Sequence, residues 1–295
     1  MAKGRLARAL TNERARAKDD ERLKKLAEHN KMKAKQKGMK NRVKKDHEGK
    51  SYRKKWVPFK TDDAVLLVGE ADFSFTRSII EQKFVFNVVA TNFDSQEVIK
   101  SKYSTAEQNI KFLENINSGS SDSSDDLDNG EDEEQGSQIS KIEIFYDVDA
   151  TKLNVTKAIK SKSFDVIVFN FPHVGKSIKD QNRNILENQK LVLGFFESAK
   201  SLLRPNGRIV LTIFEGEPYS LWNVKALAKS VDLLTARTGQ FFWEDYPGYR
   251  HSLTAKEGQT SKEQAGRTAR MHEFCVKRAK MEEQKRVTRS ESDSE

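Results

Sequence analysis

The chain has 295 residues, which is enough for one large domain or two small ones. Lys and Arg total 53 against 44 Asp and Glu, but residues 1–55 alone hold 21 basic and 7 acidic residues, so this segment carries +14 and the rest carries −5. No run of residues has the apolar core of a secretory signal or the length of a membrane-spanning helix. The single cysteine, Cys275, excludes an internal disulfide framework and a CxxC metal site.

Residues 1–55 are too strongly charged to form a hydrophobic core of their own. Their basic clusters at residues 31–37 and 42–45 fit an arm that neutralises nucleic-acid phosphates, and they also fit nuclear or nucleolar targeting. A solvated tail that improves solubility is the alternative, although one-sided charge adds little to solubility alone. We expect a largely disordered extension that binds RNA and directs the protein to the nucleolus.

The folded part is expected over residues 56–278, and its first strand is Val65–Val68. Four apolar residues run directly into a glycine turn, as in a parallel strand that is buried on both faces. The later elements are expected in this order: a helix to about residue 83, a strand over 85–91, a helix over 96–116 with a break near 104–105, a strand over 142–146, a short helix over 152–160, a strand over 164–169, a helix over 180–203, a strand over 208–214, a helix over 220–229, and strands over 233–244 and 270–277.

Two other segments are expected to be disordered. Residues 118–137 hold eight acidic residues and no basic ones, which indicates a surface insertion, and residues 279–295 read as a charged tail. Strands that alternate with helices and end in a strand pair predict an α/β fold. We expect a mostly parallel seven-stranded sheet with helices on both faces and an antiparallel last strand, as in Rossmann-like class I methyltransferases.

The turn after the first strand is the first candidate binding element. Gly69 ends the strand, Ala71 stands where a dinucleotide motif has its second glycine, and Phe73 or Ser74 stands near the third. This is a weak pattern for a pyrophosphate, which needs close approach of the backbone. The acids Glu70 and Asp72 would repel phosphates and suit an ammonium or sulfonium group, which favours S-adenosylmethionine, although both can also be solvated turn residues.

Two acids at later strand ends extend this prediction. Asp94 closes the second strand, where an acid commonly accepts hydrogen bonds from ribose hydroxyls. Asp149 follows the third strand and is placed to meet the adenine amino group, with a helix cap before Leu153 as the competing explanation.

The loop after the fourth strand, Asn170-Phe-Pro-His173, is the most specific signal. It is similar to the loops with which methyltransferases of base nitrogens hold a planar target, so Asn170 is expected to contact both cofactor and target. Phe171 would supply a stacking face, Pro172 rigidity, and His173 a base or an orienting group, although a loop-bridging histidine is an open alternative. The nearby cations are expected to contact RNA phosphates: Lys176, Lys179 and Arg183.

Aromatic residues in the later loops complete the candidate set. Tyr219, Trp222 and Tyr249 follow the fifth and sixth strands, where they can stack on exposed bases. Taken singly, an aromatic residue in such a position more often packs its own loop.

Taken together, residues 56–277 closely resemble the fungal large-subunit (25S) rRNA uridine-N3 methyltransferases, a family of Rossmann-like methyltransferase domains. The resemblance rests on residues 69–75 (Gly-Glu-Ala-Asp-Phe-Ser-Phe), 169–176 (Phe-Asn-Phe-Pro-His-Val-Gly-Lys) with 178–184, 216–222 and 241–249. Ala71 departs from the family, which usually has glycine there, and the acidic insertion is a second departure.

The resemblance implies methyl transfer from S-adenosylmethionine to N3 of a uridine in large-subunit rRNA or a pre-ribosomal particle, in the nucleolus. N3 is a protonated imide nitrogen, so a group must remove or share its proton, with His173 as first candidate and Asp72 as second. N3 also lies on the Watson–Crick edge, so the base must be unpaired or flipped. Two alternatives stay open: a non-catalytic rRNA-binding assembly factor on this fold, and a methyltransferase of another RNA base or of protein. The sequence does not fix an oligomeric state, and we assume a monomer.

Overall fold

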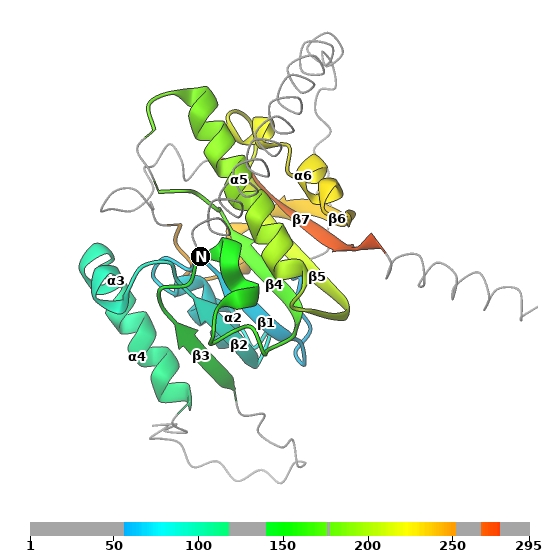
Figure 1. Ribbon diagram of the computed structural model, residues 1–295. Coiled ribbons are helices and arrows are strands. Elements are labelled where there is room, and N and C mark those ends of the chain that lie inside the picture. The colour runs from blue at the N-terminus through cyan, green and yellow to red at the C-terminus, as the bar shows by residue number, and fades with distance from the viewer. Residues whose placement is uncertain (1–55, 118–139, 176–177, 252–266, 278–295) are drawn as a thin grey trace, which may run out of the picture.

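Seven strands form one sheet in the order β3-β2-β1-β4-β5-β7-β6 (Figure 1). The computed structural model describes residues 56–117, 140–175, 178–251 and 267–277. The predicted arm over residues 1–55, the acidic insertion over 118–137, Lys176 and the tail over 279–295 lie outside these described residues.

The strands are β1 (Ala64–Val68), β2 (Asn87–Thr91), β3 (Lys141–Phe145), β4 (Phe164–Asn170), β5 (Leu203–Phe214), β6 (Leu233–Phe241) and β7 (Ala269–Val276). The helices are α2 (Ser74–Glu81), α3 (Gln96–Lys102), α4 (Ala106–Asn117), α5 (Gln181–Lys200) and α6 (Val224–Ser230), with short 3₁₀ turns η1 (Ala150–Val155), η2 (Tyr219–Trp222) and η3 (Trp243–Asp245). Strands β3, β2, β1, β4 and β5 are parallel to their neighbours. Strand β7 runs antiparallel between β5 and β6. The predicted fold class is therefore confirmed.

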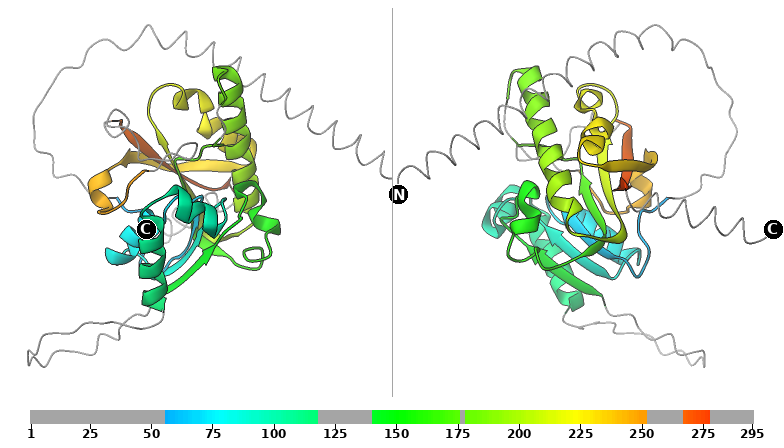
Figure 2. Two further views of the ribbon diagram at one scale, coloured as in Figure 1. Left: turned by 90° about the vertical axis from the view of Figure 1, so that its left-hand side faces the viewer. Right: turned by 45° about the vertical axis from the view of Figure 1, so that its right-hand side comes forward.

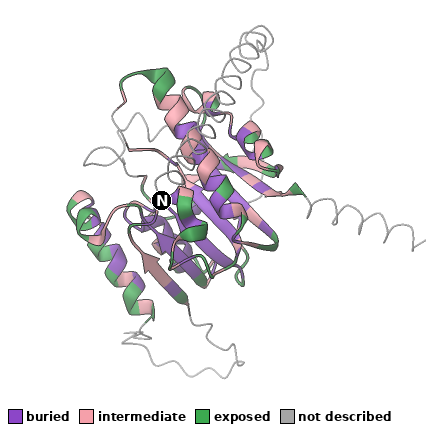
Figure 3. Cartoon of the chain, in the orientation of Figure 1, coloured by how far each residue is buried: buried purple, intermediate pink, exposed green. Residues whose placement is uncertain are grey.

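Strand β1 shows why the sheet needs helices on both faces. All five of its residues are buried, because Leu66 and Val68 pack in one core with α5 and α6 while Val65 and Leu67 pack in a second core with α2 and α4. Each fully buried side chain of this kind contributes about 1.5–3 kcal/mol. Figure 2 shows α4 and α5 on opposite sides of the sheet, and Figure 3 shows buried strands between helices whose outer faces are exposed.

Three elements differ from those predicted. Residues 152–160 form no α-helix, and residues 150–155 form the 3₁₀ turn η1 instead. Asn223 adopts a left-handed φ of 48°, which divides the helix predicted over 220–229 into η2 and α6. Strand β5 begins at Leu203 rather than Arg208, because Leu203 already pairs with Phe164 at the start of β4, before an irregularity in the register.

The order of the strands places a crevice between β1 and β4. From this pair the sheet extends through β2 to β3 on one side and through β5 and β7 to β6 on the other. In open parallel sheets, ligands bind outside the carboxyl ends of the strands at such a switch point. The turn after β1 and the loop after β4 therefore lie on the edge where a ligand is expected.

Candidate active site

A cavity of about 330 Å³ lies at this switch point. Its lining comes from the carboxyl ends of β1, β2, β3 and β4 and from the helices behind them: Gly69, Glu70, Ala71, Asn92, Phe93, Asp94, Lys102, Tyr103, Val148, Asp149, Ala150, Phe169, Phe171, His173, Val174, Gly175 and Leu191. The structure thus brings Gly69, Asp94, Asp149 and His173, which are far apart in the sequence, around one hollow.

Gly69 is required by the shape of the turn after β1. Its φ is 69°, and a Cβ built there would lie 2.5 Å from Cε2 of Phe169 on β4. Asn92 fixes the same turn from β2: its side-chain amide donates to the carbonyl oxygens of Glu70 and Ala71, the latter at 3.0 Å. Ala71 lines the cavity and is not one of the residues with positive φ, so its methyl group imposes no backbone strain.

The acids Glu70 and Asp72 both have local partners at the start of α2, and Glu70 also lines the cavity. The Glu70 carboxylate accepts from the backbone N–H and the hydroxyl of Thr76 at 3.1 and 3.0 Å. Asp72 accepts from the backbone N–H of Ser74 at 3.1 Å and the hydroxyl of Thr105 at 2.7 Å. Helix α2 has no side-chain cap of its own, so its free N–H groups take up both carboxylates. Burial raises the pKa of Glu70 to about 7, against the opposing hydrogen bonds from Thr76.

Asp72, Phe73 and Ser74 are also absent from the cavity lining. Phe73 is fully buried and packs edge-on against Tyr146 at 6.0 Å. The Ser74 hydroxyl accepts from the backbone N–H of Arg250 at 3.3 Å. The structure therefore does not bring these three residues to the cavity, where we predicted cofactor-binding roles for them and a catalytic role for Asp72.

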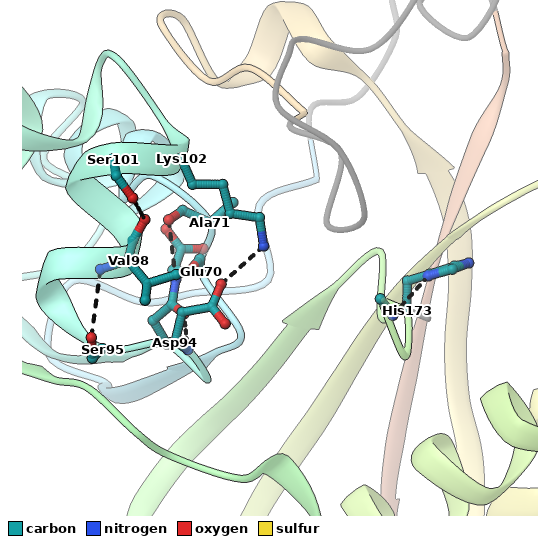
Figure 4. A network of polar contacts seen from close by, with 10 residues as sticks. Glu70, Ala71, Asp94, Ser95, Val98, Ser101, Lys102 and His173 are labelled. Carbon is teal, nitrogen blue, oxygen red and sulfur yellow. Dashed lines mark hydrogen bonds and ion pairs between the residues drawn. The ribbon is translucent and has the colours of Figure 1, made fainter. Parts of the chain in front are cut away.

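Asp94 and Lys102 form the charged side of the cavity (Figure 4). Their side chains are 3.0 Å apart, and the Asp94 backbone N–H donates to the Asn92 side chain at 2.6 Å. Burial acts to lower the pKa of Lys102, but the hydrogen bond and charge of Asp94 raise it overall. One carboxylate oxygen of Asp94 faces Lys102, and the carboxylate keeps further acceptor capacity for a hydroxyl group.

Asp149 caps a short helix, which was the alternative to its predicted contact with the adenine amino group. It also lines the cavity. It accepts from the backbone N–H and the hydroxyl of Thr151 at 2.9 and 2.7 Å, as an N-cap of η1. It also pairs with Lys152 at 2.9 Å. Burial acts to raise the pKa of Asp149, but its hydrogen bonds from Lys152 and Thr151 lower it overall. The two interpretations are compatible, because a capping carboxylate retains acceptor sites.

The loop after β4 is held by its neighbours on β5 and α5. The Thr212 hydroxyl donates to the Asn170 side-chain oxygen at 2.6 Å, and the Phe171 backbone N–H donates to the Thr212 carbonyl at 2.8 Å. The Val174 backbone N–H donates to the Asn188 side chain at 3.1 Å. Asn170 does not line the cavity, so the structure does not bring it to the predicted cofactor contact. Pro172 is buried and supports the loop rather than a substrate surface.

Phe171 lies at the centre of an aromatic cluster on the β4 side of the cavity. Its φ is 50°, and its ring stacks on Trp243 with 5.4 Å between centroids and 6° between planes. Phe214, Phe241 and His251 surround the same ring at 4.6, 5.7 and 4.8 Å. Trp243 thus covers one face of the ring that we expected to stack on a base, while Phe171 still lines the cavity.

The His173 imidazole is tied to its own loop. Its Nδ1 accepts from the backbone N–H of Gly175 at 3.1 Å, as in the loop-bridging alternative. In Figure 4 the ring extends away from Asp94 and Lys102. Burial lowers the pKa of His173. The neighbouring His251 has its pKa lowered to about 4, first by burial and then by the charge of His173.

The later aromatics pack rather than face the cavity. Trp222 is 1% exposed, which rules out stacking on a base and corrects its predicted role. Tyr219 packs between Phe214 and Trp222 beside a second cavity of about 250 Å³. Tyr249 packs on Phe75, Phe241 and Trp243, and burial followed by the nearby charges of Glu70 and Asp72 holds its pKa well above 10.

Lys179 and Arg183 are exposed at the start of α5, where the Arg183 backbone N–H donates to Asp180 at 2.6 Å. Their predicted contact with RNA stays a prediction.

Among the described residues no group of three or more His, Cys, Asp or Glu side chains can hold a metal ion. No helix in that part of the chain is both long and apolar enough to cross a membrane.

Sequence reasoning missed several residues of the site. Asn92 and Lys102 act through hydrogen bonds to Ala71 and Asp94, and Phe93 is 67% exposed at the cavity rim. Trp243 and His251 complete the aromatic cluster around Phe171. The sequence offered one signal for this part of the site: Phe93, an aromatic residue, directly precedes the predicted strand-end acid Asp94.

Comparison with known proteins is consistent with this site. Residues 66–253 match the family model described as rRNA (uridine-N3-)-methyltransferase BTM5-like. The 25S rRNA (uridine(2634)-N(3))-methyltransferase of Saccharomyces cerevisiae is 32% identical over 82% of this chain and 81% of that protein. The chain belongs to this family. The family match includes the turn at Gly69, the loop at residues 170–175 and the aromatic cluster up to His251.

Other similar proteins share only part of their length with the chain. The heavy metal-associated isoprenylated plant protein 41 of Arabidopsis thaliana is 30% identical over 66% of this chain, which spans about a third (34%) of that protein. Among solved structures, NSun6 from Pyrococcus horikoshii is 14% identical, with a TM-score of 0.44 over 74% of this chain and 49% of that chain. A methyltransferase from Pyrococcus furiosus is 15% identical, with a TM-score of 0.42 over 73% and 76% of the two chains.

Proposed function

We propose that this protein transfers a methyl group from S-adenosylmethionine to N3 of a uridine in large-subunit rRNA. The observation that carries the proposal is the cavity at the β1–β4 switch point, lined by the Gly69 turn on one rim and the Phe171–Gly175 loop on the other. Its volume of about 330 Å³ lies within the usual range of about 300–1,000 Å³ for small-molecule sites. Membership in a family of uridine-N3 methyltransferases supports the reaction and the target.

The residues of the first three strand ends fit this donor. Gly69 lets a ligand approach the backbone, Asp94 offers acceptors for ribose hydroxyls, and Asp149 an acceptor for an amino group. A dinucleotide fits less well, because its pyrophosphate normally occupies the N-terminus of the helix after β1. In this protein Glu70 and Asp72 already occupy that end of α2. S-adenosylmethionine, when bound, supplies an electrophilic methyl group on a positively charged sulfur.

The chain itself positions the acceptor. The Phe171–Gly175 loop is fixed by Thr212 and Asn188, and its residues Phe171, His173 and Val174 line the cavity from the β4 side. A flipped uracil held there would have N3 facing the methyl group, and most of the rate would come from this alignment. The low pKa of His173 and His251 keeps this side of the site uncharged at neutral pH, in keeping with a neutral base as substrate.

The direct test uses the full chain, labelled S-adenosylmethionine and an unmodified large-subunit rRNA transcript. We expect label in RNA and N3-methyluridine in the nucleoside digest by mass spectrometry. Donor binding by calorimetry runs in parallel. A chain that binds RNA but not the donor would be a scaffold protein, and label in another nucleoside would identify another base as the target.

The basic segment over residues 1–55 is proposed to hold the rRNA and to direct the protein to the nucleolus. Its net charge of +14 supports both roles. Deleting residues 1–50 should weaken RNA binding and flatten its dependence on salt, while donor affinity is retained. A truncated protein that keeps the full salt slope would show that the phosphate contacts lie in the folded domain. A fluorescent fusion of the truncated chain tests the localisation.

A further inference from the structure

The tautomer of His173 is set by a backbone hydrogen bond. The Gly175 N–H can only donate, and it lies 3.1 Å from Nδ1 of His173. Nδ1 must therefore carry the lone pair. A neutral imidazole has one acceptor nitrogen and one N–H, so the proton of His173 is on Nε2.

This assignment removes the simplest role for His173, that of a general base. The lone pair that would take a proton is engaged by Gly175, and the other nitrogen has none to offer. A second proton on Nδ1 would break the bond that shapes the loop. Burial lowers the pKa of His173 and that of the adjacent His251, so neither residue favours the charged form.

We propose that His173 is a catalytic hydrogen-bond donor, whose Nε2–H contacts a uracil carbonyl oxygen next to N3. The proposal rests on the uridine-N3 function proposed above. Uracil N3 lies between two carbonyl groups, and loss of its proton places negative charge on their oxygens. A fixed donor at one of these oxygens stabilises that charge as it develops, in the manner of an oxyanion hole. The donor therefore makes N3 more acidic without accepting its proton.

The chemical step then balances without a protein base. The N3 proton leaves to water, and the N3 electron pair forms the N–CH₃ bond. The S–CH₃ bond breaks with its electron pair kept by sulfur, which changes from a sulfonium to a neutral thioether. His173 is unchanged in protonation throughout, and its Nδ1 stays bonded to Gly175.

Three substitutions separate a donor from a base. His173→Gln keeps an N–H donor near the position of Nε2 but cannot act as a base, and we expect kcat within about tenfold of wild type. His173→Ala removes the donor, and kcat should fall about 10²- to 10³-fold, as for loss of one oxyanion-hole donor. His173→Glu supplies a base without a donor and should be at least as impaired as His173→Ala. The proposal is overturned if the Glu variant is more active than the Gln variant, or if Gln and Ala are equally impaired.

Two further measurements need only wild type and His173→Gln, and do not depend on how well the Ala and Glu variants fold. Nitrogen-15 NMR of the imidazoles distinguishes the two neutral tautomers, and the His173→Gln spectrum identifies the His173 signals among the five histidines. A proton on Nδ1 would overturn the assignment. The acidic limb of the pH profile of kcat should be the same in wild type and His173→Gln, whereas its loss in the variant would indicate a base. Wild-type protein that methylates no uridine would overturn the proposed function instead.

Discussion

The two rims of the cavity are built in different ways. The donor rim, at the ends of β1, β2 and β3, depends on polar contacts among nearby segments, such as Asn92 with Ala71 after β1 and Asp94 with Lys102 on α3. The acceptor rim, at the ends of β4 and β5, depends on aromatic contacts with distant segments, such as Phe171 with Trp243 and His251. Polar groups at strand ends bind a charged ligand of fixed shape, whereas a packed aromatic scaffold fixes the position of a loop.

The acceptor rim also stores strain. Phe171 has a φ of 50°, which costs a non-glycine residue on the order of 1–3 kcal/mol. Four rings around Phe171 hold this conformation, together with the hydrogen bond from its N–H to Thr212. The donor rim places its left-handed turn at Gly69, where no such cost arises. Substitutions should therefore affect donor binding on one rim and turnover on the other.

The largest effect is expected on the donor rim, from Gly69→Arg. A side chain at Gly69 starts 2.5 Å from Phe169 and would have to enter the cavity, so donor binding should fall below detection by calorimetry. Gly216→Ala is the matched control for backbone strain, because Gly216 also has a positive φ of 85° but has open space around it. Equal loss of donor affinity in both variants would mean that global destabilisation, not the cavity, explains the effect.

On the acceptor rim, Phe171→Ala should leave donor affinity within about threefold while kcat falls about 10²-fold. The physical reason is that the ring positions the loop carrying His173, and a displacement of about 1 Å in a reacting group costs on this order. Phe171→Leu, which keeps much of the apolar volume, should recover part of the rate. Donor calorimetry and single-turnover methylation measure the two quantities. A donor affinity that falls with kcat would show that the rims are not separable.

Much of the fold, and the placement of Gly69, Asp94 and Asp149 around one cavity, could be predicted from the sequence. The buried run at residues 65–68, the break near residues 104–105 and the antiparallel last strand follow from local composition and connection order, and each is observed. Gly69 and Asp94 were found because parallel strands place their carboxyl ends on one edge.

The direction of side chains beyond a strand end was not predictable in the same way. Glu70 and Asp72 were expected to face the ligand, but the start of α2 at Ser74 leaves free N–H groups that take both carboxylates. Trp222 is buried in the core between β5 and the helices, and Tyr249 packs on Phe75 from α2, which no local period reports. The acceptor rim therefore needed the tertiary structure.

A smaller effect is expected from Asp94→Asn on the donor rim. The substitution keeps the size of the side chain but removes the charge that pairs with Lys102 and that would accept from ribose hydroxyls. Hydrogen bonds to charged groups contribute about 1.5–3 kcal/mol, so donor affinity should fall roughly 10- to 100-fold. Asp147→Asn is the control, because Asp147 is exposed near the same edge and asparagine tolerates its φ of 57°. If both variants bind the donor as tightly as wild type, Asp94 does not contact it.

Stability should depend on pH through two buried groups, Glu70 on the donor rim and His272 on β7. His272 on β7, beside the second cavity, has its pKa lowered to about 4, first by burial and then by Lys225 and Arg270, so it stays neutral while the unfolded chain takes up a proton near pH 6.5. Stability should therefore be lost as pH falls from about 6.5 to 4, and His272→Gln should relieve up to about 3 kcal/mol of this loss.

On the donor side the pKa of Glu70, raised by burial to about 7, gives the opposite sign. The unfolded carboxyl ionises near pH 4.5, so the folded state loses relative stability as pH rises from 4.5 through 7, and Glu70→Gln should gain most above pH 7. Urea unfolding of wild type and both variants between pH 4 and 8 measures the two slopes. If the free energy of unfolding depends on pH in the same way in both variants, the pKa shifts of Glu70 and His272 do not control this dependence.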